Sequence, residues 1–393
     1  MKDNQAKYPQ LRFKGFTDPW EERKLGELAN IVRGASPRPI QDPKWFDKDS
    51  DIGWLRISDV TEQDGRIRHL EQRISKLGQE KTRVLMEPHL LLSIAATVGK
   101  PLVNYVKTGV HDGFLIFLNP VFDREFMFQW LDMFRPKWKK YGQPGSQVNL
   151  NSELVRNQEI DLPRIEEQQQ IGSFFKQLDD IIALHQRKLD LLKEQKKGYL
   201  QKMFPKNGAK VPELRFAGFA DAWEQRKVSE LADRYDNLRV PITASERVAG
   251  ETPYYGANGI QDYVEGFTHN GEFVLVAEDG ANDLQNYPVQ YVDGKVWVNN
   301  HAHVLQAKEE RVDNKFLTNA LKHTNIEPYL VGGGRAKLNA DVMMKINFKV
   351  PTLPEQVQIG KFFDNLDHLI ALHQRKLEKL QELKKGYLQK MFC

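Results

Sequence analysis

Few residues of this sequence have the types and the spacing that catalysis requires. An amino-methyltransferase holds an extruded base with an Asp/Asn-Pro-Pro-Tyr/Phe loop, and the sequence contains no such loop. The run VGK at 98–100 ends like a phosphate-binding loop, but Ile94 replaces its first glycine and Pro101 replaces its magnesium-binding Ser/Thr. The glycines at 332–334 follow no clear strand and open no long helix, as a dinucleotide fingerprint would require. The sequence therefore predicts a binding protein without catalytic machinery.

The alternating histidines His301 and His303 could supply two metal ligands. They lie on a predicted strand without a nearby acidic cluster, and the only cysteine is Cys393. We therefore interpret them as hydrogen-bonded or contact residues and predict no metal site. A single cysteine also excludes a disulfide framework and a thiolate site, which fits a reducing cytoplasm.

The composition is that of a globular protein with two or three domains. The chain has 393 residues, of which 40% are hydrophobic, and a mean hydropathy of -0.58. The most apolar run, LLLSIAATV from Leu90, is too short to cross a bilayer and predicts a buried strand. No signal peptide is visible, so we expect a cytoplasmic protein without a membrane contact. The net charge of +4 and the pI near 8.8 permit a polyanionic partner without demanding one.

The elements that must position any binding residues begin with a long helical repeat. Residues 167–204 recur almost unchanged as 355–392, with HQRKL and KKGYLQKMF identical in both copies. Apolar residues recur at a mean spacing of about 3.5 residues over roughly five heptads, which is typical of a coiled-coil seam. The predicted seam of the first copy comprises Ile171, Phe175, Leu178, Ile182, His185, Leu189, Leu192, Lys196, Tyr199 and Met203. The predicted seam of the second copy comprises Ile359, Phe363, Leu366, Ile370, His373, Leu377, Leu380, Lys384, Tyr387 and Met391.

We expect these two helices to pair with each other, because each seam needs a helical partner and the other copy is the nearest one. A helix of about 37 residues spans about 55 Å at 1.5 Å per residue, so the pair would act as a spacer. His185 and His373 occupy equivalent seam positions. A polar seam residue more often fixes register than binds a metal, so we predict a structural role for both.

A second repeat, the leading segment, marks the start of each half. The leading segment YPQLRFKGFTDPWEERKLGELA at 8–29 matches VPELRFAGFADAWEQRKVSELA at 211–232. Each one is followed by a middle of unrelated sequence, over about 30–161 and 233–349, and then by the long helix. A duplicated frame with divergent inserts predicts two different binding surfaces in a pseudo-twofold arrangement. A tandem duplication that has drifted is the alternative, but it predicts divergence along the whole chain.

Each middle is predicted to be a small domain of strands plus one helix. GWLRISDV from Gly53 has a strand pattern and is followed by a turn at Asp64-Gly65. Helical patterns begin at Arg124 in the first middle and at Asn314 in the second. The second middle also carries three type I′ hairpin signals, at Asn258-Gly259, Asn270-Gly271 and Asp293-Gly294. The predicted fold class is therefore α+β.

This order of motifs resembles the specificity subunit of type I restriction-modification systems. The resemblance rests on YPQLRFKGFTDPWEERKLGEL, a GS-x-x-x-LN loop before I-D-L-P, the E-E-Q-x-x-I helix start, and VNNHAHVL with its upstream PYYGANG. It covers essentially the whole chain and implies four segments. The first target-recognition domain with its leading segment occupies 1–161, the central conserved helix 162–206, the second target-recognition domain 207–349, and the C-terminal conserved helix 350–393.

The resemblance also implies an arrangement and a function. Two mixed α/β target-recognition domains would be separated by a pair of long antiparallel coiled-coil helices. Proteins of the family are non-catalytic, and each domain reads one half of a bipartite double-stranded DNA target while the helices set the gap. Two modification subunits dock on the conserved regions and methylate adenine, and restriction subunits add translocation and cleavage. This chain would hold no cofactor, because S-adenosylmethionine, ATP and magnesium belong to the partner subunits.

Candidate DNA contacts are polar or basic residues in loops and at strand ends of the two middles. In the first domain they are Arg33, Arg38, Arg56, Ser58, Arg66, Arg68, Lys100, Ser146, Gln147 and Asn149. In the second domain they are Arg239, Tyr254, Tyr255, Asn258, Asn299, Asn300, His301, His303, Arg335 and Lys337. For any single one, a solvated surface role is at least as frequent. The Gly-rich loops at Gly145 and Gly333 are the favoured sites.

Basic residues beside the seam admit two interpretations. These residues are Arg187, Lys188, Lys196, Lys197, Arg375, Lys376, Lys384 and Lys385. They are either solvated faces or a repeated surface that contacts phosphates or modification subunits. Two rival functions also stay open for the chain: a self-sufficient nuclease or methyltransferase, which the absent motifs disfavour, and a coiled-coil scaffold that binds protein without reading DNA.

Overall fold

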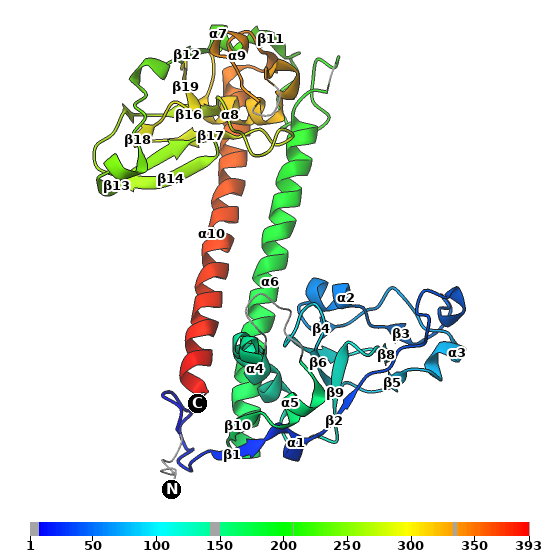
Figure 1. Ribbon diagram of the computed structural model, residues 1–393. Helices are drawn as coiled ribbons and strands as arrows, with labels where there is room; N and C mark the ends of the chain where they lie inside the picture. The colour runs from blue at the N-terminus through cyan, green and yellow to red at the C-terminus, as the bar shows by residue number, and fades with distance from the viewer. Residues whose placement is uncertain (1–7, 142–149, 207, 333–335, 393) are drawn as a thin grey trace. The chain divides into compact units, whose positions relative to one another are not determined.

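The computed structural model describes most of the chain as folded elements (Figure 1). The described residues are 8–141, 150–206, 208–332 and 336–392. None of the helices in these ranges carries an apolar stretch of the length that a bilayer span requires.

The chain divides into two compact units. The first comprises Met1–His185 with Lys376–Cys393, and the second comprises Gln186–Arg375. Each unit contains one mixed α/β domain and one segment of each long helix, α6 (Ile165–Met203) and α10 (Leu353–Met391). The predicted α+β class with its internal repeat is confirmed.

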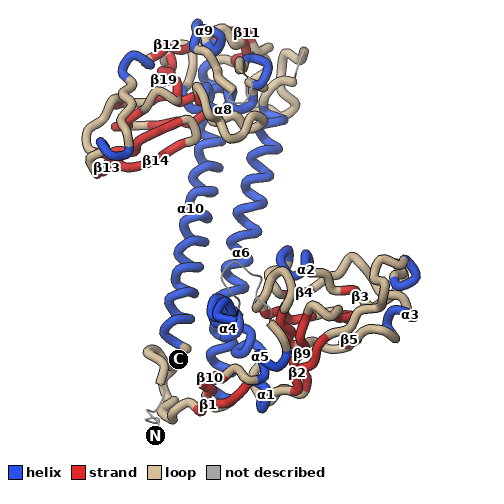
Figure 2. Tube along the Cα trace, in the orientation of Figure 1, coloured by secondary structure: helices blue, strands red, loops and turns tan. Residues whose placement is uncertain are grey.

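Two sheets form the domain of the first unit (Figure 2). The larger sheet has the strand order β2 (Asn30–Arg33), β9 (Phe114–Leu118), β6 (Leu90–Ser93), β7 (Pro101–Asn104) and β4 (Arg66–Ile67). The smaller sheet has the order β3 (Gly53–Trp54), β8 (Thr108–Val110) and β5 (Arg83–Leu85). The strand β1 (Glu21–Lys24) pairs with β10 (Glu159–Leu162). The α-helices of this domain are α1 (Leu25–Leu28), α2 (Ile57–Glu62), α3 (Lys76–Gln79), α4 (Arg124–Phe134) and α5 (Ser152–Arg156).

Two four-stranded sheets form the domain of the second unit. One has the order β12 (Ala232–Arg234), β19 (Ala302–Ala307), β16 (Phe273–Ala277) and β17 (Val289–Val292). The other has the order β14 (Gly259–Val264), β13 (Ala249–Gly256), β18 (Lys295–Val298) and β15 (His269–Asn270). The remaining elements are β11 (Glu224–Lys227), which pairs with β20 (Asn347–Val350), and the helices α7 (Val228–Leu231), α8 (Asn314–His323) and α9 (Ala340–Met343).

The long helices run antiparallel within each unit. In the first unit the Phe174 ring on α6 lies 5.2 Å from the Tyr387 ring on α10, and Lys384 pairs with Asp179 at 2.6 Å. In the second unit the corresponding contacts are Tyr199 with Phe362, at 5.0 Å between ring centroids, and Lys196 with Asp367. The residues of the two predicted seams are all buried or half-buried. The start of one helix therefore lies beside the end of the other in both units.

An aromatic cluster joins each domain to the long helices. In the first unit Phe126 of α4 lies 5.2 Å from Phe392 and 6.1 Å from Trp20, between ring centroids. Phe392 in turn stacks on Phe175 of α6 at 5.9 Å. The second unit repeats this cluster with Phe316, Phe204, Trp223 and Phe363. The same aromatic contacts therefore form in both units.

Each long helix packs closely on the first turn of the domain helix. Asp123 caps α4 by accepting the Phe126 N–H at 2.8 Å, and its own N–H donates to the Gln168 side chain of α6 at 2.9 Å. Gly172 lies against this cap, where an added Cβ would stand 2.5 Å from Asp123 Oδ1 and 2.7 Å from Phe126 N. The second unit repeats this contact with Asp313, Phe316, Gln356 and Gly360.

A buried ion pair ties each leading segment to a long helix. Arg12 donates two hydrogen bonds of 2.7 Å to the Glu167 carboxylate, whose side chain is only 1% exposed. Arg215 and Glu355 form the same bidentate pair in the second unit at 2.7 Å. The neighbouring Leu11 N–H donates to the Lys390 carbonyl near the end of α10 at 2.8 Å. Each leading segment therefore joins the start of one long helix to the end of the other.

The GWLRISDV prediction is wrong beyond its first residues. The strand β3 ends at Trp54, and α2 begins at Ile57, because the Asp59 carboxylate accepts the backbone N–H of Arg56 at 2.8 Å and caps the first turn. The predicted turn at Asp64-Gly65 is confirmed, with φ angles of 47° and 74°. The buried strand at Leu90 and the two domain helices are also confirmed.

Only one of the three predicted hairpins in the second domain forms. Asn258-Gly259 joins β13 to β14, which pair antiparallel. Across Asp293-Gly294, however, β17 pairs with β16 while β18 pairs with β13 and β15. The Gly271 and Gly294 backbones instead bond each other, N–H to O, at 3.2 and 3.1 Å. Both glycines have positive φ and let the chain leave one sheet and join the other.

We expect Gly172→Ala to destabilise the protein by about 1–3 kcal/mol, because the new Cβ would overlap the cap of α4. The control is Gly198→Ala in the same helix, where nothing lies within 4 Å of an added Cβ. Alanine there should stabilise the helix by about 0.5–1 kcal/mol. Denaturant unfolding measures both variants, and equal shifts would contradict the close contact.

We expect Arg12→Ala to cost about 3–5 kcal/mol, because it leaves the buried Glu167 carboxylate without its cation. Arg23→Ala is the matched control, since Arg23 pairs with Glu27 on an exposed surface, and it should change stability little. Hydrogen exchange of the first turns of α6 should accelerate in Arg12→Ala alone. Similar exchange in both variants would show that the pair does not hold the leading segment.

Candidate nucleic-acid interface

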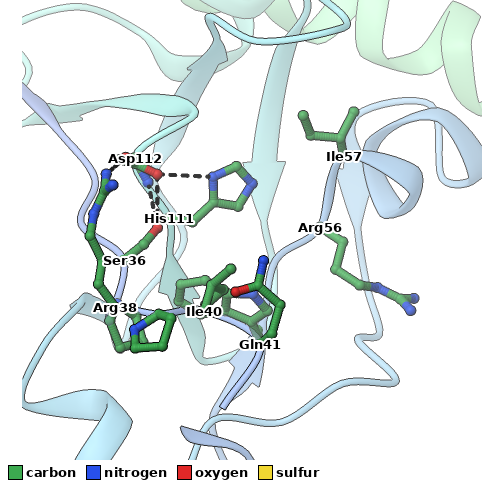
Figure 3. Close-up of a pocket in the computed structure, with 11 residues that line it drawn as sticks. Ser36, Arg38, Ile40, Gln41, Arg56, Ile57, His111 and Asp112 are labelled. Carbon is green, nitrogen blue, oxygen red and sulfur yellow. Dashed lines mark hydrogen bonds and ion pairs between the residues drawn. The ribbon is translucent and has the colours of Figure 1, made fainter.

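A cavity of about 730 Å³ opens in the domain of the first unit (Figure 3). Its lining residues come from the segment after β2, from the end of β3 to the start of α2, and from the two residues after β8: Ser36, Pro37, Arg38, Pro39, Ile40, Gln41, Trp54, Arg56, Ile57, His111 and Asp112. Two predicted DNA contacts, Arg38 and Arg56, are among them. The cavity therefore combines an apolar wall with hydrogen-bond donors, as a specific binding surface requires.

Asp112 organises one side of this cavity. Its carboxylate accepts the Arg38 Nη2–H at 3.0 Å and the Ser36 hydroxyl at 2.8 Å, and its backbone carbonyl accepts the Arg33 Nε–H at 2.6 Å. Burial raises the pKa of Asp112, but the Ser36 hydrogen bond and the Arg33 charge lower it more, so the net pKa lies below the ordinary value. The structure thus brings Arg33 and Arg38 together on Asp112, Arg33 on its backbone carbonyl and Arg38 on its carboxylate, and sequence analysis missed this residue. The partners are about 75 residues apart in sequence, so no local signal identified Asp112.

Three other predicted contacts of the first domain are held in ion pairs. Arg56 donates to Asp59 at 2.8 Å and to Glu71 at 3.3 Å, which raises the pKa of its guanidinium. Arg66 is largely buried and pairs with Glu125 at 2.6 Å, and Lys100 pairs with Asp64 at 2.7 Å. These cations are neutralised inside their own domain.

The remaining predicted contacts of the first domain are divided between surface and undescribed positions. Ser58 on α2 is exposed, and Arg68 is exposed over the Tyr105 ring at 5.1 Å. Ser146, Gln147 and Asn149, together with Gly145, lie outside the described residues, as do Arg335 and Gly333 of the second domain.

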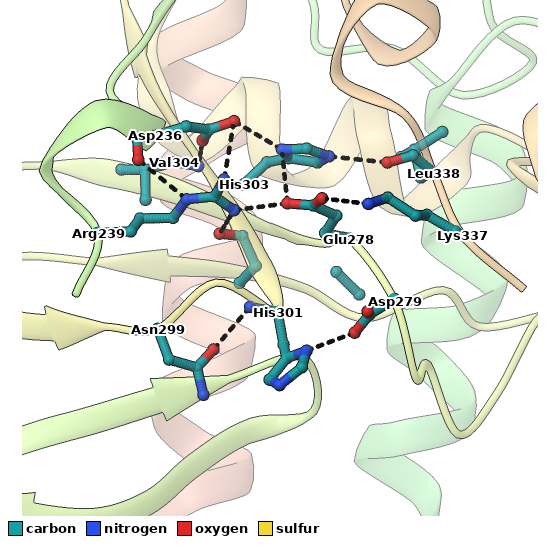
Figure 4. Close-up of polar contacts among 12 residues, drawn as sticks. Asp236, Arg239, Glu278, Asp279, Asn299, His301, His303, Val304, Lys337 and Leu338 are labelled. Carbon is teal, nitrogen blue, oxygen red and sulfur yellow. Dashed lines mark hydrogen bonds and ion pairs between the residues drawn. The ribbon is translucent and has the colours of Figure 1, made fainter. Parts of the chain in front are cut away.

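In the second domain, predicted contacts from four segments meet at the loop after β16, and Figure 4 shows those of Arg239, His301 and Lys337. Asn258 donates to the Gly280 carbonyl at 2.9 Å, and His301 Nδ1 lies 2.5 Å from Asp279. Lys337 and Arg239 both pair with Glu278, at 2.9 and 2.6 Å. Asn300 is exposed beside His301. The loop at 278–282 therefore gathers residues that are distant in sequence into one surface.

Three other predicted residues of this domain are buried. Tyr254, Asn299 and His303 are 1%, 4% and 1% exposed, and burial raises the pKa of the half-buried Tyr255. Asn299 and His303 support the surface from within, because Asn299 accepts the His301 N–H and His303 bonds Leu338, whereas the Tyr254 hydroxyl bonds the Ile242 backbone.

His303 connects three segments through both ring nitrogens. Nδ1 lies 2.7 Å from the Asp236 carboxylate and Nε2 lies 2.8 Å from the Leu338 carbonyl. Burial raises the pKa of Asp236, but hydrogen bonds from His303 and the Val304 N–H lower it more, so its net pKa is below the ordinary value. The network holds the segment around Lys337 against the sheet. Sequence analysis missed Asp236 and Glu278, because its search was limited to donors.

No group of three His, Cys, Asp or Glu side chains that could hold a metal ion occurs among the residues the structure describes. Of the basic residues beside the seam, Lys196 and Lys384 pair with aspartates of the facing helix. The other six, at equivalent positions in both helices, are exposed: Arg187, Lys188, Lys197, Arg375, Lys376 and Lys385.

Comparisons with known proteins agree with this architecture. The "Putative type I restriction enzyme specificity subunit S.HindORF215P" of Haemophilus influenzae is 47% identical over 148 residues, which is 38% of each chain. The type I restriction enzyme MjaVIII specificity subunit of Methanocaldococcus jannaschii is 20% identical, and the match covers 94% of this chain and 91% of that protein.

A solved structure shows the same fold. The crystal structure of a type I restriction-modification system S subunit from M. genitalium matches with a TM-score of 0.72 at 13% identity, covering 98% of this chain and 99% of that one.

The family model for the type I restriction modification DNA specificity domain matches residues 17–194 and 220–382, which is more than half of the chain. The chain therefore belongs to the family of type I restriction-modification specificity subunits, with one specificity domain in each half.

Proposed function

We propose that this chain gives a type I restriction-modification complex its DNA sequence specificity and catalyses no reaction itself. Each target-recognition domain reads one half of a bipartite double-stranded target, and the helix pair sets the spacing between the halves. The complex acts in the cytoplasm. This proposal is favoured over a coiled-coil scaffold that does not bind DNA, because the family membership covers both domains.

The observation that carries this proposal is one repeated frame that holds two different surfaces. The frame contacts, such as Arg12 with Glu167 and Arg215 with Glu355, are the same in both units. The surfaces differ: one is built around Asp112 and the other around the loop at 278–282. Two dissimilar surfaces on equivalent frames suit an asymmetric target, because each one can read its own half-site.

Partners and cofactors follow from this proposal. Two modification subunits dock on the two copies of the repeat, and restriction subunits complete the nuclease. The six exposed basic residues at equivalent positions of α6 and α10 support a task performed once by each copy. S-adenosylmethionine, ATP and magnesium are bound by the partner subunits.

We expect adenine methylation at a single bipartite motif in cells that express this chain with its modification subunit. The motif should disappear when the chain is removed, because the modification subunit alone carries no target-reading surface in this proposal. Genome-wide mapping of methylated adenine measures this outcome. An unchanged methylation pattern, although the complex assembles, would contradict the proposal and favour the scaffold.

We expect the purified complex to bind duplex DNA with an affinity that falls as salt rises. The slope of log affinity against log salt should be near -0.9 for each phosphate contacted. At fixed salt, changing either half of the mapped motif should weaken binding, whereas changing the gap sequence should not. Equal affinity for all these duplexes would show that the chain supplies no specificity.

A further inference from the structure

Arg38 is an exposed arginine whose orientation is fixed by one carboxylate. Its side chain is 81% exposed, and its Nη2 donates to Asp112 Oδ2 at 3.0 Å. A guanidinium carries five N–H donors, and this hydrogen bond uses one of them. Most of the donor edge of Arg38 therefore faces solvent at the cavity of the first domain.

Asp112 is itself held in place. The Ser36 hydroxyl donates to Oδ1 at 2.8 Å, the Asp112 N–H donates back to Ser36 Oγ at 3.2 Å, and the Arg33 Nε–H binds the Asp112 carbonyl at 2.6 Å. Because one carboxylate oxygen is bound by Ser36, the other points toward Arg38 (Figure 3). The guanidinium is thus presented in a defined direction before any ligand arrives.

The charge around Asp112 is in excess of what one carboxylate neutralises. Two guanidinium groups, those of Arg33 and Arg38, hydrogen-bond Asp112, and Arg83 donates from Nε to the Arg33 carbonyl at 2.8 Å. By contrast, Arg56 meets two carboxylates and Arg66 meets Glu125 and Asp179. Two arginines therefore share one carboxylate at Arg38, whereas Arg56 and Arg66 each pair with two carboxylates.

We infer that Arg38 reads a guanine in the major groove of the half-site bound by the first domain, with Asp112 as its positioning residue. The inference rests on the proposed function. Guanine presents O6 and N7 as two adjacent acceptors, which match two N–H donors of a guanidinium held in a fixed direction. A phosphate contact does not require a guanidinium held in a fixed direction. Arg33 and Arg83 supply the phosphate contacts beside the base contact.

The first experiment maps methylation in cells that carry the full complex with Arg38→Lys. Lysine keeps the charge but lacks the planar fork of N–H donors that matches guanine O6 and N7 in a fixed direction. We expect one guanine position in one half-site to become degenerate while the other half-site is unchanged. Asp112→Asn should relax the same position to a smaller extent, and a normal motif in that variant would overturn the role of Asp112.

A matched control separates this effect from the loss of any exposed ion pair. Arg164 also pairs with an aspartate on the surface, with Asp18 at 3.1 Å, and its side chain is 72% exposed. Arg164→Lys should leave the motif intact. An intact motif in Arg38→Lys would overturn the inference while the proposed function stands. A wild-type complex without any bipartite motif would overturn both.

The second experiment uses the wild-type complex and does not depend on the folding of a variant. Each guanine of the mapped motif is replaced in turn by 7-deazaguanine, which lacks the N7 acceptor. One replacement should weaken binding on the order of tenfold, as expected for the loss of a bidentate base contact. The same replacement should weaken Arg38→Lys less, because the lysine ammonium is a point charge without the oriented fork. Binding that tolerates every replacement, or an equal loss in Arg38→Lys, would overturn the guanine contact of Arg38.

Discussion

A buried carboxylate at the start of each long helix is the constraint on which the frame depends. The side chains of Glu167 and Glu355 are 1% and 0% exposed, so each one requires the two N–H donors of Arg12 or Arg215. Each ion pair holds a leading segment against the start of one long helix. The backbone of that leading segment also bonds the end of the other long helix, from Leu11 to Lys390 and from Leu214 to Lys202. One ion pair in each unit therefore fixes three parts of the chain together.

This constraint explains why the two middles could diverge while the helices could not. The repeated frame contacts involve the leading segments, the long helices and the first turns of α4 and α8, where Gly172 and Gly360 allow close packing. The remaining strands contact mainly their own domain. One domain can thus have sheets of five and three strands and the other two sheets of four, without altering the attachment to the helices.

Carboxylates determine which basic residues are available to a ligand. Arg56, Arg66 and Lys100 are as basic as Arg38, yet acids within the same domain neutralise them. Asp112 acts differently, because it holds Arg38 without covering it. In the second domain Glu278 pairs with Arg239 and Lys337, and Asp236 with His303. Each surface is shaped by the acids beneath it as much as by the donors on it.

The sequence by itself determined the features that depend on local periodicity and on repetition. The seam spacing identified both long helices, the repeat located the leading segments, and the apolar patterns located α4 and α8. Each of these signals lies within one segment, because helical periodicity repeats every few residues.

Only the tertiary structure decided the contacts between distant segments. The turn at Asp293-Gly294 looked like a hairpin, but β17 pairs with β16 and β18 pairs with β13, in separate sheets. His301 and His303 looked equivalent, but β19 begins at Ala302, so His301 lies half-buried in the turn before the strand and His303 lies buried within it. Arg38 and Arg66 looked alike until Asp112 and Glu125 were placed beside them. Strand pairing, burial and ion pairing join residues far apart in the chain. A local sequence pattern does not identify these distant partners.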